Sequence, residues 1–179
     1  PSSYDDVTRA PSFPGGYNAV LLRFSDYLKT LAEKRGATVA DLNNPLLKVL
    51  EKAKSTDEKA AQSIVPDRIH PGWGGHLIMG ASLLKAWNAP SVVTSVEIDG
   101  GNGQLLASSK TVVSEMAADA SGYRWKQQDE ALPMPLPTPS TLPGLMLAVK
   151  SSDFEETMNM QMLRLKGAKA ARYALKING

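Results

Sequence analysis

Cysteine is absent from the sequence, and histidine occurs only twice, as His70 and His76. The lack of cysteine excludes disulfides, thiolate metal sites and a cysteine nucleophile. Apolar runs long enough to cross a membrane are also missing, and no targeting segment is visible. Basic residues number 20 and acidic residues 18, with the lysines scattered along the chain. This balance argues against nucleic acid as the main partner.

What the sequence does contain is typical of a globular protein. Apolar residues make up 42% of the 179 positions and charged residues 21%, so disorder is not indicated. A chain of this length suits one domain, or one domain with a small appendage.

The hydrophobic pattern changes character near residue 90. Apolar residues at steps of three and four predict an amphipathic helix over 17–35, and a second helix over 44–54. Between them, "ATVADL" at 37–42 resembles a short buried strand of an α/β layer. A third helix over 75–87 is apolar around most of its circumference, so we expect it to be largely buried. The first half is therefore predicted to be α/β.

The second half is predicted to be rich in β-structure. Apolar residues alternate over 92–98, and "DGGNG" at 99–103 is typical of a hairpin turn that leads into a strand at 104–108. Further strands are expected at 111–116, 123–127, 154–165 and 171–177, with a proline-rich loop between Pro133 and Pro143. We therefore expect two domains, 1–90 and 91–179.

An Asp-x-x-His pattern stands between two prolines, in the stretch "VPDRIHPGWGG" at 65–75. Pro71 keeps His70 out of the helical region, at the mouth of the following helix. Asp67 can fold back to accept the proton on one imidazole nitrogen, which leaves the other nitrogen free as a base. The competing interpretation is that Asp67 caps a turn and His70 fills it. Spacing alone leaves both open.

A metal site is the other chemistry that these residues could carry. His76 lies six residues after His70 and could join it and Asp67 around a metal ion. Two histidines at that spacing across a helix start converge poorly, and no further ligand is near in sequence. We therefore expect no metal and no cofactor, with His76 as a packing residue.

The same stretch resembles the last motif of the SGNH or GDSL hydrolases, an Asp-x-x-His-Pro loop that leads into a helix. "DRIHP" followed by "GGHLIMGASLLKAW" is similar to that motif, and "GGYNAVLLRFSDYLKTLAEKRGATVADLNNPL" is similar to the helix and strand before it. The resemblance covers about residues 1–90, and the β-rich region resembles an extension in a bacterial subset of the family. It implies a three-layer, flavodoxin-like α/β fold followed by a β-rich extension. It also implies a serine-dependent carboxylic ester hydrolase, esterase or lipase-like, with Asp67 orienting and His70 as general base.

The family's nucleophile block is not found in these residues. No Gly-Asp-Ser occurs, nor the Gly-x-Asn-Asp that would supply oxyanion donors. We therefore expect a portion of a longer hydrolase, which is inactive alone and requires a complementary N-terminal portion with the serine, or self-association. The resemblance implies a small ester as substrate and makes a secreted or periplasmic location plausible. The alternative is a noncatalytic β-rich binding module, for example for carbohydrate, on a remnant of the hydrolase fold.

Overall fold

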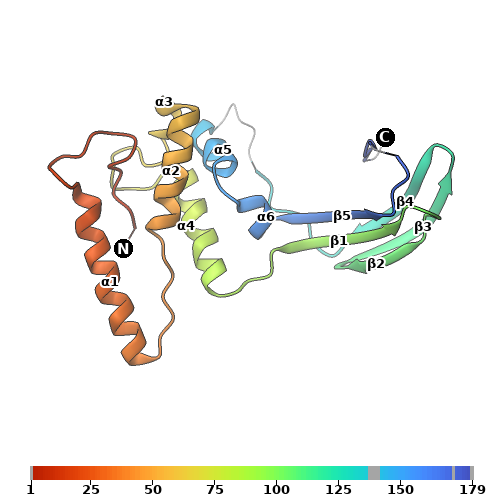
Figure 1. Ribbon diagram of the computed structural model, residues 1–179, viewed down its shortest axis with the longest axis horizontal. Helices are drawn as coiled ribbons and strands as arrows, with labels where there is room; N and C mark the ends of the chain where they lie inside the picture. The colour runs from red at the N-terminus through yellow and green to blue at the C-terminus, as the bar shows by residue number, and fades with distance from the viewer. Residues whose placement is uncertain (1, 137–141, 171, 178–179) are drawn as a thin grey trace. The chain divides into compact units, whose positions relative to one another are not determined.

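The computed structural model describes residues 2–136, 142–170 and 172–177, and it contains both helices and small sheets (Figure 1). The chain divides into two compact units. One consists of Pro1–Pro90 with Pro135–Met158, and the other of Ser91–Met134 with Asn159–Gly179. The mixed helix and strand content agrees with the α/β class expected from the sequence. The expected division into domains 1–90 and 91–179 remains a prediction. The two units described here also change at residue 90, but the segment 135–158 belongs with the first unit.

The first unit is helical in the residues that the structure describes. Its helices are α1 (Tyr17–Arg35), α2 (Asn44–Thr56), α3 (Glu58–Ala61), α4 (Trp73–Ala86), α5 (Pro143–Lys150) and α6 (Phe154–Met158). Helix α4 contacts α2, α5 and α6, and α5 also contacts α2 and α3. No helix in the described part of the chain is both long and apolar enough to span a membrane.

The core of this unit lies between α2, α3, α4 and α5. Four residues of α2 are almost fully buried because they recur at helical spacing on one face: Leu46, Val49, Leu50 and Ala53. Ile78 of α4 and Ala148 of α5 complete that cluster together with Ala61, Ile64 and Val65. Removal of this apolar surface from water is the main force that holds the four helices together.

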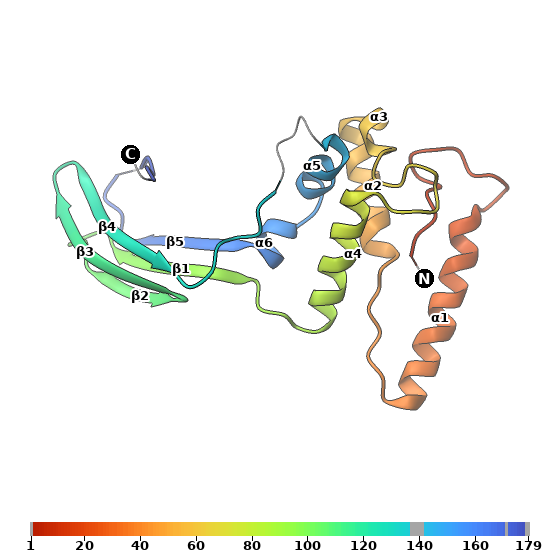
Figure 2. The ribbon, with the colours of Figure 1, turned by 180° about the vertical axis from the view of Figure 1, so that it is seen from behind.

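Helix α1 forms where the sequence predicts it, over Tyr17–Arg35, but it packs differently from α2. No other helix or strand of the described residues packs along it, and both views show it standing apart from α2 and α4 (Figures 1 and 2). Its apolar side chains remain exposed, including Phe24 at 59% and Tyr27 at 66%. Its first turn is anchored. Asn18 and Asn43 exchange a reciprocal pair of amide hydrogen bonds, each 3.0 Å long, and the ring of Tyr17 packs edge-on against that of Tyr4.

The expected strand at 37–42 is wrong for this chain. The segment is irregular, because no strand among the described residues lies beside it to accept its backbone hydrogen bonds. It ends at Asp41, whose carboxylate accepts hydrogen bonds from the backbone amides of Asn43 and Asn44, both 3.0 Å long. The segment therefore serves as the approach to α2.

The second unit consists of two small sheets. Strand β1 (Val92–Asp99) pairs antiparallel with β2 (Leu105–Ser109) and parallel with β5 (Met160–Lys166), and β3 (Thr111–Asp119) pairs antiparallel with β4 (Gly122–Asp129). The β1–β2 pairing confirms the predicted hairpin. Gly103, at φ 76°, supplies the left-handed backbone of its turn.

Three further expectations need correction. Residues 154–158 form helix α6 rather than the start of a strand, because Phe154 is buried against the helical core. Residues 172–177 form no strand, and 171 lies outside the described residues, as do 137–141 of the proline-rich loop. Helix α4 is buried on one face only, since Leu84 is 41% exposed.

Candidate active site

The loop between α3 and α4 carries the Asp-x-x-His pattern. Its backbone is tied by short-range hydrogen bonds, from the amide of Arg68 to the carbonyl of Val65 (3.2 Å) and from the amide of Gly72 to the carbonyl of Ile64 (2.9 Å). Arg68 itself adopts a left-handed backbone conformation, φ 74°, which is uncommon for a residue with a side chain. That conformation reverses the chain between the aspartate and the histidine.

Asp67 uses both carboxylate oxygens inside this turn. Oδ1 accepts hydrogen bonds from the backbone amides of His70 (2.7 Å) and Ile69 (3.0 Å). Oδ2 lies 2.6 Å from the imidazole Nδ1 of His70. The turn and the side-chain pair, which the sequence presents as alternatives, therefore coexist. One oxygen fixes the backbone while the other holds the ring.

The electrostatics of the pair follow from these contacts. The pKa of Asp67 lies well below its ordinary value, first because of the hydrogen bond with the His70 side chain and then because of the amides of His70 and Ile69. The carboxylate is therefore ionised and can only accept hydrogen bonds. We assign the imidazole proton to Nδ1 for that reason, which leaves Nε2 of the neutral ring with a free lone pair.

Solvent reaches the pair freely. The side chain of His70 is 79% exposed and that of Asp67 is 56% exposed. Within the described part of the chain, Nε2 of His70 has no hydrogen-bond partner, whereas Nδ1 has Asp67. Ile69 and Trp73 beside the pair are also exposed, at 54% and 72%.

His76 occupies a different position from His70. Its Nδ1 lies 3.1 Å from the carbonyl oxygen of Gly72, one helical turn earlier in α4, and its side chain is exposed. Among the residues that the structure describes, no three His, Asp or Glu side chains come together as metal ligands. His76 therefore does not join the Asp67–His70 pair around a common centre here.

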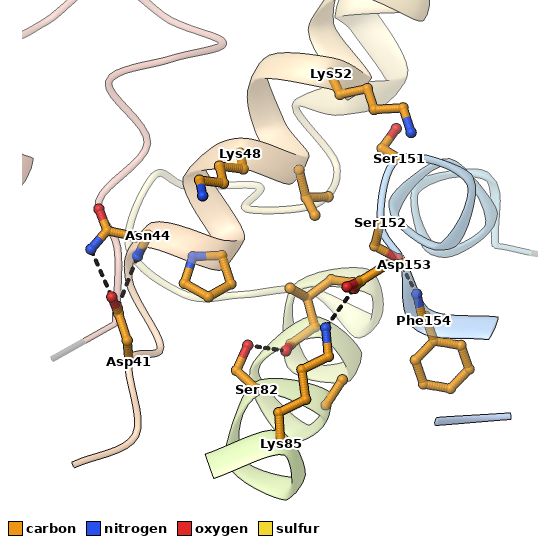
Figure 3. Close-up of a pocket in the computed structure, with 14 residues that line it drawn as sticks. Asp41, Asn44, Lys48, Lys52, Ser82, Lys85, Ser151, Ser152, Asp153 and Phe154 are labelled. Carbon is orange, nitrogen blue, oxygen red and sulfur yellow. Dashed lines mark hydrogen bonds and ion pairs between the residues drawn. The ribbon is translucent and has the colours of Figure 1, made fainter. Parts of the chain in front are cut away.

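A cavity of about 500 Å³ lies elsewhere in the same unit, between α2, α4 and the turn at 151–153 (Figure 3). Sequence reasoning did not single out its polar side chains, which include Lys48, Lys52, Lys85, Ser82 and Asp153. Nζ of Lys85 forms an ion pair with Oδ1 of Asp153 at 2.5 Å. The hydroxyl of Ser82 donates to the carbonyl of Ile78 in its own helix. No histidine is among the side chains that line this cavity.

Comparison with known proteins gives a fold but no family. No family model matches the chain, and no curated protein matches it. A solved structure described as a gut microbial diltiazem-metabolizing enzyme is similar, with a TM-score of 0.72 and 24% sequence identity. The match covers 92% of this chain but only 39% of the solved one. The chain thus spans about two fifths of the length of that enzyme, and the likeness at this identity concerns the fold.

Proposed function

We propose that this chain supplies the Asp67–His70 half of the active site of a serine-dependent carboxylic ester hydrolase of the SGNH or GDSL type. The observation that carries the proposal is the contact of 2.6 Å between Oδ2 of Asp67 and Nδ1 of His70, with the far nitrogen of the ring open to solvent. A nucleophile on a second portion of the protein would complete the site, since these residues contain no Gly-Asp-Ser.

The chemistry assigned to the pair is general base catalysis. Nε2 of His70 takes the proton of the serine hydroxyl as the oxygen attacks the ester carbonyl, and the ring later returns that proton to the leaving alcohol. Asp67 holds Nδ1 in place and stabilises the imidazolium that forms in between. The lowered pKa of Asp67, caused first by its hydrogen bond with His70, keeps the carboxylate charged during this cycle.

The complementary portion would also cover surfaces that this chain leaves open. The apolar face of α1, which we define as Tyr17, Phe24, Tyr27, Leu28 and Leu31, is exposed, and apart from the contacts of Tyr17 with Tyr4 and Phe13 no helix or strand of the described residues packs along it. The irregular segment 37–42 has the composition of a buried strand. In a three-layer, flavodoxin-like arrangement this segment would join a sheet of the missing portion, with α1 packed on one face of that sheet. The partial coverage of the diltiazem-metabolizing enzyme is consistent with such a missing portion.

Activity of the isolated chain is the first test. We expect it to hydrolyse an activated acetyl ester, such as p-nitrophenyl acetate, no faster than free imidazole does. A base without nucleophile or oxyanion donors gives little acceleration, because each such donor contributes on the order of a hundredfold or more. Turnover by the chain alone that a serine-directed phosphonate abolishes would contradict the assignment of the serine to another portion.

The decisive test uses the full open reading frame that encodes the chain. If a Gly-Asp-Ser segment precedes residue 1, the whole protein should hydrolyse small acyl esters. His70→Ala should then lower kcat by roughly three to four orders of magnitude or more, as loss of a triad base does. His76→Gln is the matched control, because this second histidine is also exposed but lies apart from Asp67. Equal loss in both variants would contradict the role of His70 as the base. Absence of any nucleophile segment, with no hydrolysis by the whole protein, would favour the noncatalytic binding module instead.

A further inference from the structure

The loop that holds Asp67 and His70 combines short-range hydrogen bonds of its own with contacts from a distant part of the chain. It follows α3, a helix of only four residues, and both side chains of the pair are exposed. Arg68, between them, is held at φ 74°, a conformation that costs free energy unless surrounding contacts enforce it. The contacts that enforce it come from the N-terminal segment 4–10, which lies beside this loop in both views (Figures 1 and 2).

Arg9 binds the first half of the loop through its guanidinium group. Nη1 donates to the carbonyl of Val65 (3.1 Å), and Nη2 donates to the carbonyls of Pro66 (2.7 Å) and Gln62 (3.4 Å). These carbonyls lie at the end of α3 and immediately before Asp67. The guanidinium presents its N–H donors as a planar fork and reaches these carbonyls from two separate nitrogens, a geometry that the single ammonium nitrogen of lysine does not reproduce.

Asp5 fixes Arg9 and also binds the second half of the loop. Its carboxylate is fully buried, and Oδ2 accepts a hydrogen bond from Nη1 of Arg9 (2.9 Å). Oδ1 accepts from the backbone amides of Val7 and Thr8, which closes a turn around the arginine. The backbone amide of Asp5 donates to the carbonyl of Arg68 (2.9 Å), the residue with positive φ.

Arg68 returns a contact to the same segment. Its Nη1 donates to the carbonyl of Ala10 (2.8 Å), and its guanidinium lies over the ring of Tyr4, 5.9 Å from the centroid. Hydrogen bonds thus run in both directions between the segment and the loop, on each side of Asp67. The segment has no helix or strand of its own, so side-chain contacts position it, including the packing of Val7 against the core and the hydrogen bond from Lys54 to the carbonyl of Val7.

We propose that residues 4–10 form a positioning strap for the Asp67–His70 pair, with Arg9 as its principal positioning residue and Asp5 as the group that orients Arg9. The role of the pair rests on the proposed function, but the strap itself is a statement about geometry. If Arg9 releases the carbonyls of 62, 65 and 66, Arg68 relaxes out of the left-handed region. Oδ2 of Asp67 then no longer reaches Nδ1 of His70.

The test is the tautomer of the His70 ring in the 179-residue chain, read from the ring ¹⁵N shifts by NMR. With only two histidines, the His76→Gln background leaves a single ring to observe. At alkaline pH, where an imidazole is neutral, we expect the proton of His70 on Nδ1. Arg9→Lys should move the ring shifts most of the way toward those of Asp67→Asn, because lysine keeps the charge but not the fork.

Arg23→Lys is the matched control, since Arg23 is exposed on α1, and it should leave the ring shifts unchanged. Amide shifts of α2 and of β1 report whether the variants remain folded. A ring that keeps its Nδ1 proton in folded Arg9→Lys would overturn the strap. Asp5→Asn gives a second measurement, and if that buried substitution prevents folding, Arg9→Lys alone decides.

The outcome separates the strap from the proposed function. If Arg9→Lys shifts the tautomer but the whole protein cleaves no ester, the strap holds and the hydrolase assignment fails. If the whole protein is an esterase that depends on His70 and Arg9→Lys leaves the tautomer intact, the hydrolase assignment holds and the strap is wrong. If the whole protein is active and the strap positions the Asp67–His70 pair, Arg9→Lys should lower kcat with little change in KM, because Arg9 makes no contact with the substrate.

Discussion

Helices α1 and α2 have similar amphipathic patterns and opposite environments. Leu50 of α2 has no exposed surface, whereas Leu28, on the apolar face of α1, is 44% exposed. Helix α2 lies among three other helices of the first unit, and α1 is anchored only at its first turn. Periodicity thus predicts that a helix has a face to bury, but it does not predict whether the partner is on the same chain.

Truncation of one leucine in each helix measures this difference. Leu50→Ala should lower the free energy of unfolding by about 2–5 kcal/mol, the usual cost of removing a fully buried leucine side chain. Leu28→Ala should cost less than about 1 kcal/mol, since surface substitutions have small effects. Urea denaturation of both variants is the measurement. Similar losses would show that the apolar face of α1 is buried in solution, by association of the chain with itself.

The state of association tests the same face directly. Because the apolar face of α1 is exposed in the single chain, we expect concentration-dependent self-association when the complementary portion is absent. Phe24→Ser with Tyr27→Ser should reduce it, as measured by sedimentation velocity over a range of concentrations. The matched control is Arg23→Ser with Lys34→Ser on the polar face of the same helix. A wild-type chain that stays monomeric at high concentration would contradict this expectation.

The Asp67–His70 loop should contribute to function far more than to stability. The pKa of Asp67 is lowered in the folded protein, mainly by its hydrogen bond with His70. The carboxylate therefore stabilises the folded protein at any pH above the pKa that Asp67 has in the unfolded chain. That stabilisation is lost only as the pH falls through the lower pKa that Asp67 has in the folded protein. Urea midpoints of wild type and Asp67→Asn should therefore differ little at neutral pH, because the pair is exposed, and converge in strong acid. A large difference at neutral pH would indicate a structural role.

Much of the secondary structure could be predicted from local pattern. Helix α1 has the bounds that its apolar spacing and Gly36 predict, and the β1–β2 hairpin forms around the predicted turn. The wrong predictions fall on segments whose secondary structure is determined by contacts with distant parts of the chain. Segment 37–42 has a strand's composition but no strand beside it, and residues 154–158 are helical because Phe154 fills a gap beside α4 and α5.

The candidate site shows the same division. The three-residue spacing of Asp67 and His70 allows their contact, so the sequence could propose the pair but could not choose it over a turn. The roles of Asp5 and Arg9 could not be predicted, because they act on carbonyls more than fifty positions away in the sequence. A buried aspartate four residues before an arginine has no distinctive sequence pattern outside a helix.

By itself, the sequence determined which segments could be helices, which could form a hairpin, and that one aspartate lies within reach of one histidine, because these depend on contacts a few residues apart. Tertiary structure alone decided that α2 is buried while α1 is not, since burial needs a partner surface. It also decided that Arg68 is held in a left-handed conformation from the N-terminal segment. Such a backbone is unfavourable locally, and contacts with a distant part of the chain add to the local hydrogen bonds that offset its cost.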